Sequence, residues 1–188
     1  MSELPELFDR AAERFGAVVH GVGSGQWGDA TPCTDWDVRA LVNHLVYELR
    51  WAPPLLAGQT IAEVGTRFDG DLLGDDPSAA WDDAVRAARA AVAAPGALDT
   101  TVHLSFGDTP AMGYLTQLTG DLAVHAWDLA RGIGADDTLD PELVGYITEA
   151  VKPMAAELAA SGMFDPPADV PADADEQTRM LALFGRRA

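Results

Sequence analysis

The residues of this chain best suited to chemistry are an aspartate and two histidines that can converge on one point. Asp121 and His125 stand four positions apart in a predicted helix, so their side chains share one helix face, with Cβ atoms about 5–6 Å apart. His44 lies upstream on another predicted helix. One carboxylate and two imidazoles can hold a divalent metal and leave coordination positions open, as catalytic metal sites do. We therefore predict a metal site made of His44, Asp121 and His125.

Two residues that follow His125 on the same predicted helix are candidates to support it. A metal-binding histidine normally donates its other ring N–H to a carboxylate or a carbonyl. Asp128 lies three positions after His125, and Arg131 lies one turn later. The alternative is an ordinary ion pair between Asp128 and Arg131 within the helix.

The remaining histidines and the single cysteine are weaker candidates. His20 stands at a predicted helix end, where a histidine interacts favourably with the helix dipole. His103 lies in a predicted hairpin, where alternation indicates a surface or packing role. Cys33 precedes a helix start, which can stabilise a thiolate, although a lone cysteine in a loop is usually structural. Trp36 and Trp127 are expected to be core or rim aromatics.

Helices with apolar stripes must position these residues. Ser2 is the predicted cap of the first helix, and Thr34 is the predicted cap of the second, with Asp37 at its third position. Pro53 and Pro54 are expected to end the second helix. The apolar periodicity predicts helices at about 3–19, 35–52, 77–94, 110–132, 140–160 and 175–184, and a short hairpin between 98 and 109.

These elements predict an all-α fold built around about four long helices. The length of 188 residues fits one domain. We expect a helical bundle over residues 1–160 and a C-terminal tail over 161–188 that packs on it. A carboxylate beside the apolar stripe of such a helix is costly to bury unless it is paired or bound to a metal.

Charge and hydropathy exclude several classes of partner. The formal net charge of −18 argues against nucleic acids and anionic membrane surfaces, which favour lysine and arginine. No apolar run approaches the roughly 20 residues of a membrane span. The N-terminal residues are acidic and amphipathic, unlike a secretory signal, so we expect a cytoplasmic protein. The single cysteine excludes an internal disulfide.

Two segments resemble the signatures of a known family. Residues 31–45 (TPCTDWDVRALVNHL) and 121–131 (DLAVHAWDLAR) resemble those of the mycothiol-dependent maleylpyruvate isomerase N-terminal-domain family, whose members are DinB-like four-helix bundles. Residues 175–186 (DEQTRMLALFGR) resemble the ending of an actinobacterial subfamily of unassigned function. By position, the resemblance implies His44, Asp121 and His125 as metal ligands. Asp121 replaces the glutamate of the characterised isomerase, and its shorter side chain must either approach the metal closely or remain outside its first coordination sphere.

The resemblance also implies a divalent metal, with zinc preferred over nickel or iron, and mycothiol as a cosubstrate. A metal-coordinated thiol is deprotonated, and its thiolate could attack a small electrophile in a transferase or an isomerase reaction. We expect a short tail in place of the isomerase's separate C-terminal domain, so the substrate need not be maleylpyruvate.

The sequence allows three alternatives. The chain could be a metal-binding stress or interaction module without catalysis. Two histidines and one carboxylate also match the ligand set of an iron oxygenase, but the family resemblance implies thiol chemistry and no site for a 2-oxoacid is readable, so this alternative is discounted. The histidines could also be purely structural. A homodimer formed through an exposed helix face is left open as well.

Overall fold

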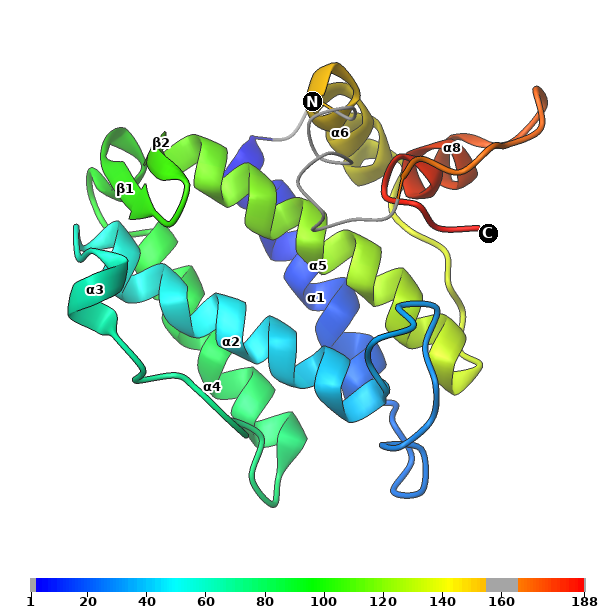
Figure 1. Ribbon diagram of the computed structural model, residues 1–188, viewed down its shortest axis with the longest axis horizontal. Helices are drawn as coiled ribbons and strands as arrows, with labels where there is room; N and C mark the ends of the chain where they lie inside the picture. The colour runs from blue at the N-terminus through cyan, green and yellow to red at the C-terminus, as the bar shows by residue number, and fades with distance from the viewer. Residues whose placement is uncertain (1–2, 155–165, 188) are drawn as a thin grey trace.

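A computed structural model describes residues 3–154 and 166–187, and it shows a mostly helical chain with one small antiparallel sheet (Figure 1). This confirms the expectation of a helical protein with a short hairpin. The helices are α1 (Leu4–Val19), α2 (Val38–Leu56), α3 (Ile61–Val64), α4 (Pro77–Val92), α5 (Ala111–Ile133), α6 (Pro141–Val151) and α8 (Glu176–Leu183), with 3₁₀ turns η1 (Ala97–Asp99) and η2 (Lys152–Met154) and strands β1 (Thr101–Leu104) and β2 (Gly107–Pro110).

The four long helices α1, α2, α4 and α5 pack against one another around one core. Helix α1 contacts α5 and α4, and α2 contacts the same two helices from the other side (Figure 1). Each long helix turns its apolar stripe inward, which removes that surface from water. The largest fully buried side chains include Phe8, Phe15, Leu41, Leu45, Leu49, Trp81, Leu115, Leu122, Trp127 and Leu129.

Helix α2 begins three residues later than the sequence predicts, so Thr34 is not its cap. Asp37 is the N-cap, and its carboxylate accepts a hydrogen bond from the backbone N–H three residues on. The preceding loop is fixed by Thr31, whose hydroxyl lies 2.8 Å from the carbonyl oxygen of Trp36. Both Thr34 and Asp37 are acceptable cap residues, and in the structure residues 34–36 belong to this loop and Asp37 is the cap.

The two prolines do not end α2 where the sequence predicts. Pro53 and Pro54 lie within its last turn, and the helix continues to Leu56. The backbone N–H of Ala57 then donates to the carbonyl of Pro53 at 3.1 Å. A proline removes one hydrogen bond from a helix, and two prolines in the last turn allow only a few more residues before the helix ends.

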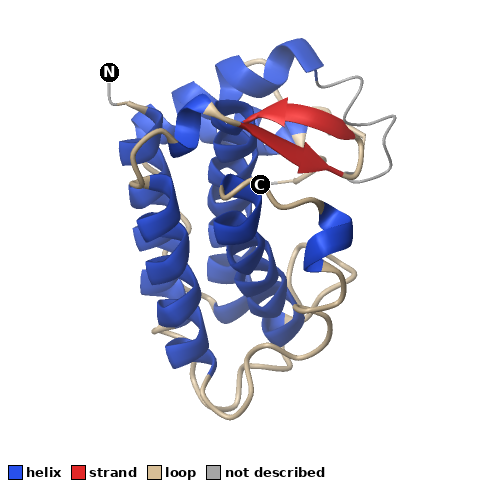
Figure 2. Cartoon of the chain, turned by 90° about the vertical axis from the view of Figure 1, so that its left-hand side faces the viewer, coloured by secondary structure: helices blue, strands red, loops and turns tan. Residues whose placement is uncertain are grey.

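The hairpin lies at one end of the long helices and leads directly into α5 (Figure 2). Its register pairs Thr101 with Pro110 and His103 with Asp108. The backbone N–H of Ala111, the first residue of α5, donates to the carbonyl of Thr100. The hairpin therefore anchors the start of the helix that carries Asp121 and His125.

The C-terminal elements pack outside the four long helices. Asp140 caps α6, and its carboxylate accepts hydrogen bonds from two backbone N–H groups. Helix α8 packs on α6 (Figure 1). Residues 155–160 of the predicted fifth helix, the predicted cap Ser2, and the division between residues 160 and 161 lie outside the described residues. Among the described helices, none combines the length and apolar character of a membrane span.

Candidate metal centre

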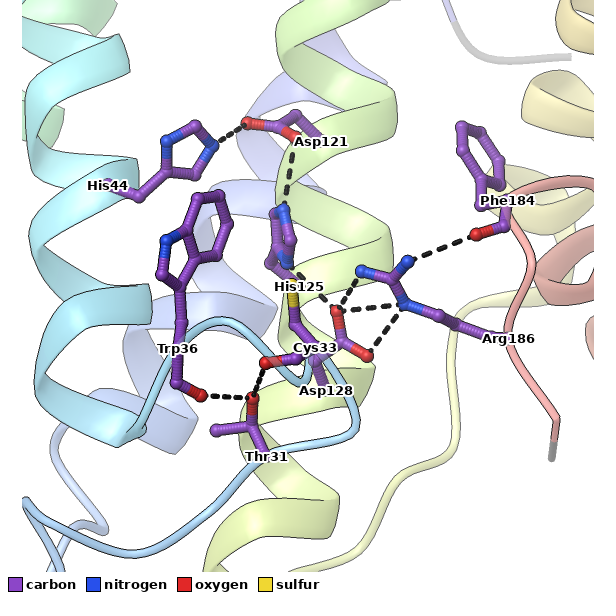
Figure 3. Close-up of polar contacts among 9 residues, drawn as sticks. All are labelled: Thr31, Cys33, Trp36, His44, Asp121, His125, Asp128, Phe184 and Arg186. Carbon is purple, nitrogen blue, oxygen red and sulfur yellow. Dashed lines mark hydrogen bonds and ion pairs between the residues drawn. The ribbon is translucent and has the colours of Figure 1, made fainter. Parts of the chain in front are cut away.

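The structure brings His44, Asp121 and His125 together between α2 and α5. One nitrogen or oxygen atom from each residue lies within 4.8 Å of the others. Nε2 of His44 is 3.1 Å from Oδ2 of Asp121, and Nε2 of His125 is 3.3 Å from Oδ1 of the same carboxylate. Asp121 therefore lies between the two imidazoles, as Figure 3 shows.

The packing of α2 against α5 makes this convergence possible. Asp121 and His125 share one face of α5 because they are four residues apart, and His44 comes from the facing side of α2. The side chains of His44 and Asp121 are 23% and 19% exposed, whereas that of His125 is 4% exposed. The cluster therefore opens to solvent on the side of His44 and Asp121.

Trp36, from the loop before α2, covers both imidazoles. Its ring stacks on His44 with centroids 4.4 Å apart and an interplanar angle of 28°. It also lies 5.4 Å from the His125 ring. Trp36 is half-buried, so it forms part of the rim of this cluster, which fits the expected role of a rim aromatic.

The charges of the cluster stabilise one another. Burial opposes ionisation of Asp121, but the imidazoles of His125 and His44 hold the pKa of its carboxyl well below the usual range. Burial likewise lowers the pKa of His125, but the carboxylates of Asp121 and Asp128 outweigh it and raise that pKa to about 9. Without a metal, Asp121 is thus a carboxylate and His125 an imidazolium at neutral pH.

Asp128 holds the second nitrogen of His125. Nδ1–H of His125 donates to Oδ2 of Asp128 at 2.9 Å, which directs Nε2 toward Asp121. Asp128 has no exposed surface and also accepts hydrogen bonds from the guanidinium of Arg186. Burial raises its pKa, but His125 and Arg186 together lower it below the usual value. This is the position that a carboxylate supporting a metal-binding histidine occupies.

The structure places the other sequence candidates elsewhere. Arg131 pairs with Asp137 at 3.1 Å and lies over the Trp127 ring, so it joins neither Asp128 nor His125 in the described structure. His20 pairs with Asp82 at 3.1 Å. His103 pairs across the hairpin with Asp108 at 2.7 Å.

Cys33 lies closer to the cluster than its sequence position suggested. Its sulfur is within 4.8 Å of ligand atoms of His125 and Asp128. It does not precede a helix start directly, because α2 begins at Val38. Burial raises the pKa of the thiol, and the nearby Arg186 opposes this only in part. Cys33 is therefore a protonated thiol at neutral pH, which makes it a poor nucleophile.

Two polar groups near Asp121 were not predicted. Glu48 lies one helical turn after His44, and burial together with the charge of Asp121 raises the pKa of its carboxyl to about 7. The buried hydroxyl of Tyr114, two turns before Asp121, has no hydrogen-bond partner among the described residues. Burial and the nearby carboxylates of Glu48 and Asp121 raise the pKa of Tyr114. The spacing from His44 to Glu48 equals that from Asp121 to His125 and could have revealed Glu48.

The three central residues fit a divalent metal in type and spacing. Two imidazoles and one carboxylate are common zinc ligands, and zinc bonds of about 2.0–2.1 Å place tetrahedral ligand atoms roughly 3.3 Å apart. The two observed separations are close to this value, although they involve different carboxylate oxygens: Nε2 of His44 lies 3.1 Å from Oδ2 of Asp121, and Nε2 of His125 lies 3.3 Å from Oδ1. They are also hydrogen-bond distances, so the residue types and their convergence within 4.8 Å are what indicate a metal site. The shorter Asp121 side chain reaches both imidazoles.

Comparison with known proteins places the chain in a family. Residues 8–130 match the family model of the mycothiol maleylpyruvate isomerase N-terminal domain. Two uncharacterized proteins of Mycobacterium tuberculosis, from strains CDC 1551 and H37Rv, are each 34% identical over 157 residues, covering 81% of this chain and 76% of theirs. No solved structure gives a significant match. Because this family model matches more than half of the chain, the chain belongs to the mycothiol maleylpyruvate isomerase N-terminal domain family.

Proposed function

We propose that this protein is a metal-dependent enzyme that uses a low-molecular-weight thiol, mycothiol, to attack a small electrophile. The observation that carries the proposal is the convergence of His44, Asp121 and His125 in a chain of this family. We further propose that the four long helices form the DinB-like bundle of the family, and that the C-terminal tail completes the same domain.

His44, Asp121 and His125 would hold the metal, for which zinc is the best candidate. When bound, zinc supplies the acidity that keeps a coordinated thiol as a thiolate at neutral pH. The fixed Nδ1–H bond of His125 to Asp128 leaves Nε2 as its ligating atom. The exposed side at His44 and Asp121 is where a thiol would enter.

Three neighbouring residues have roles that follow from their environment. Trp36 shields one side of both imidazoles from water. In the metal-free protein, burial and the charge of Asp121 raise the pKa of the Glu48 carboxyl to about 7. A bound cation would lower this pKa, so Glu48 would be a carboxylate able to accept a proton at neutral pH. The thiol proton would pass to the Glu48 carboxylate. The buried hydroxyl of Tyr114 has no hydrogen-bond partner among the described residues and would donate to a substrate that enters far enough to reach it.

Two outcomes are compatible with this arrangement. If the thiolate adds to a carbon–carbon double bond and is then eliminated after rotation, the product is an isomer and the thiol is regenerated. If the new carbon–sulfur bond is kept, the protein is a transferase. Both reactions begin with the same nucleophile and need the same three ligands.

Metal analysis of the untagged protein tests the site. We expect close to one zinc per chain, lost in His44→Ala and in His125→Ala and retained in His103→Ala. The hairpin histidine is the matched control because its partner is Asp108, away from the cluster. Far-UV circular dichroism checks that each variant folds. Parental zinc content in both cluster variants, or no zinc in the parent after reconstitution, would remove the basis of the proposal.

Thiol binding separates an enzyme from a metal-binding module without catalysis. Calorimetry with mycothiol should give binding to the zinc-loaded protein and none to the His44→Ala variant. A zinc-loaded protein that binds no thiol would favour the non-catalytic module.

A further inference from the structure

Arg186 connects the chain after α8 to the interior of the four long helices. Nε of Arg186 is 3.0 Å from Oδ1 of Asp128, and one terminal nitrogen is 2.8 Å from Oδ2. The other terminal nitrogen donates to the carbonyl of Phe184 at 3.0 Å. The arginine is 8% exposed and the aspartate is fully buried. Figure 3 shows this guanidinium facing the Asp128 carboxylate, which in turn faces His125.

These contacts fix the orientation of the carboxylate. A guanidinium fork that donates to both oxygens of a carboxylate restrains its rotation as well as neutralising its charge. Oδ2 of Asp128 therefore stays 2.9 Å from Nδ1 of His125, and Nε2 of His125 stays turned toward Asp121. The chain of contacts runs from Arg186 through Asp128 to His125.

Arg186 lies outside the segment that the family model matches, which ends at residue 130. It is separated from Asp128 by 58 positions. Its place depends on the packing of α8 against α6 and on the return of the chain toward α5. The support for His125 therefore comes partly from the C-terminal segment, which the family model does not cover.

We propose that Arg186 is a positioning residue of the metal centre, which holds His125 in its metal-binding orientation through Asp128. The inference rests on the proposed function, because it assumes that His125 binds a metal. It assigns the C-terminal segment a second role besides covering the core, namely to set how tightly the metal is held.

Zinc affinity, measured by competition with a chromophoric chelator, tests this role. Loss of an outer hydrogen-bond partner typically weakens metal binding 10–100-fold. Because Arg186 acts through Asp128, we expect about a tenfold loss for Arg186→Gln, at the lower end of that range. Arg187→Gln, which removes the same charge from the adjacent exposed residue, should bind zinc as the parent does. Parental affinity in a folded Arg186→Gln variant would overturn the proposal.

A second variant covers the case in which Arg186→Gln does not fold. Arg186→Lys keeps the charge but offers one nitrogen in place of the fork. We expect partial rescue, with about a threefold loss of zinc affinity. If only this variant folds and it binds zinc within twofold of the parent, the proposal is wrong.

A nuclear magnetic resonance experiment on the metal-free protein supplies a readout that does not depend on zinc. The ring N–H of His125 that donates to Asp128 should give a slowly exchanging proton signal, identified by its loss in Asp128→Asn. That signal should shift or disappear in Arg186→Gln and persist in Arg187→Gln. If the parent binds no zinc, the proposed function fails, and this signal still decides whether Arg186 positions His125.

Discussion

Replacing Glu48 with glutamine should make the metal-free protein more stable above neutral pH. Burial and the charge of Asp121 raise the pKa of the Glu48 carboxyl from 4.5 to about 7 in the folded chain. Between these values the folded protein keeps a proton that the unfolded chain releases, so stability falls as pH rises through this window. Each pKa unit corresponds to about 1.4 kcal/mol, and the shift therefore costs the parent about 3 kcal/mol by pH 8. Glutamine cannot ionise and avoids this loss.

Urea denaturation of metal-free parent and Glu48→Gln proteins, from about pH 4 to about pH 8, measures the effect. The difference in free energy of unfolding between the two should change by about 3 kcal/mol in favour of the variant as pH rises. Glu149→Gln, which removes a charge from the exposed side of α6, corrects for the general effect of lowering a net charge of −18.

The shape of the pH dependence is the decisive result. A difference that stays constant across this range would show that Glu48 ionises in the folded protein as it does in the unfolded chain. The reasoning would then fail at its physical premise, that Glu48 is enclosed beside the Asp121 carboxylate.

Two further predictions concern the helices that position the cluster. Asp37→Ala should lower the free energy of unfolding by about 1 kcal/mol, because it removes the cap of α2, whereas Thr34→Ala should leave it nearly unchanged. Urea denaturation measures both variants. A larger loss of stability in Thr34→Ala than in Asp37→Ala would contradict the observed cap. Gly16→Ala would place a Cβ atom 2.7 Å from Nε1 of Trp81, so we expect a loss of about 1–3 kcal/mol. Gly145→Ala meets no atom within 4 Å and should gain up to about 1 kcal/mol. Equal thermal unfolding midpoints for the two glycine variants would refute the close approach of α1 to α4.

Much of the fold could be predicted because its long helices carry regular apolar stripes. The expected ranges for α1, α4 and α5 differ from the observed ones by no more than two residues. The start of α2 could not be predicted from local rules, since Thr34 and Asp37 both satisfy them. The loop before α2, in which the Thr31 hydroxyl donates to the carbonyl of Trp36, extends past Thr34, and the helix begins only after Asp37.

The residues of the candidate site were likewise predictable only in part. The spacing of Asp121 and His125 placed both on one helix face, and it also placed Asp128 next to His125. Arg131 was an equally reasonable partner by spacing, but its guanidinium turns outward to Asp137. The contact of Arg186 with Asp128 was not predicted, because it depends on how the chain after α8 packs, and neither an apolar stripe nor a family signature assigned a role to this arginine.

The link between Arg186 and Asp128 also has a consequence for synthesis of the chain. The four long helices are complete once Ile133 has been made, whereas Arg186 follows 53 residues later. At roughly 5–20 residues per second, this interval lasts about 3–10 s. During it, the nascent chain contains His44, Asp121 and His125 but lacks the guanidinium that neutralises Asp128. Ribosomes paused before residue 186 would therefore carry chains in which the Asp128 carboxylate lacks its ion pair with Arg186.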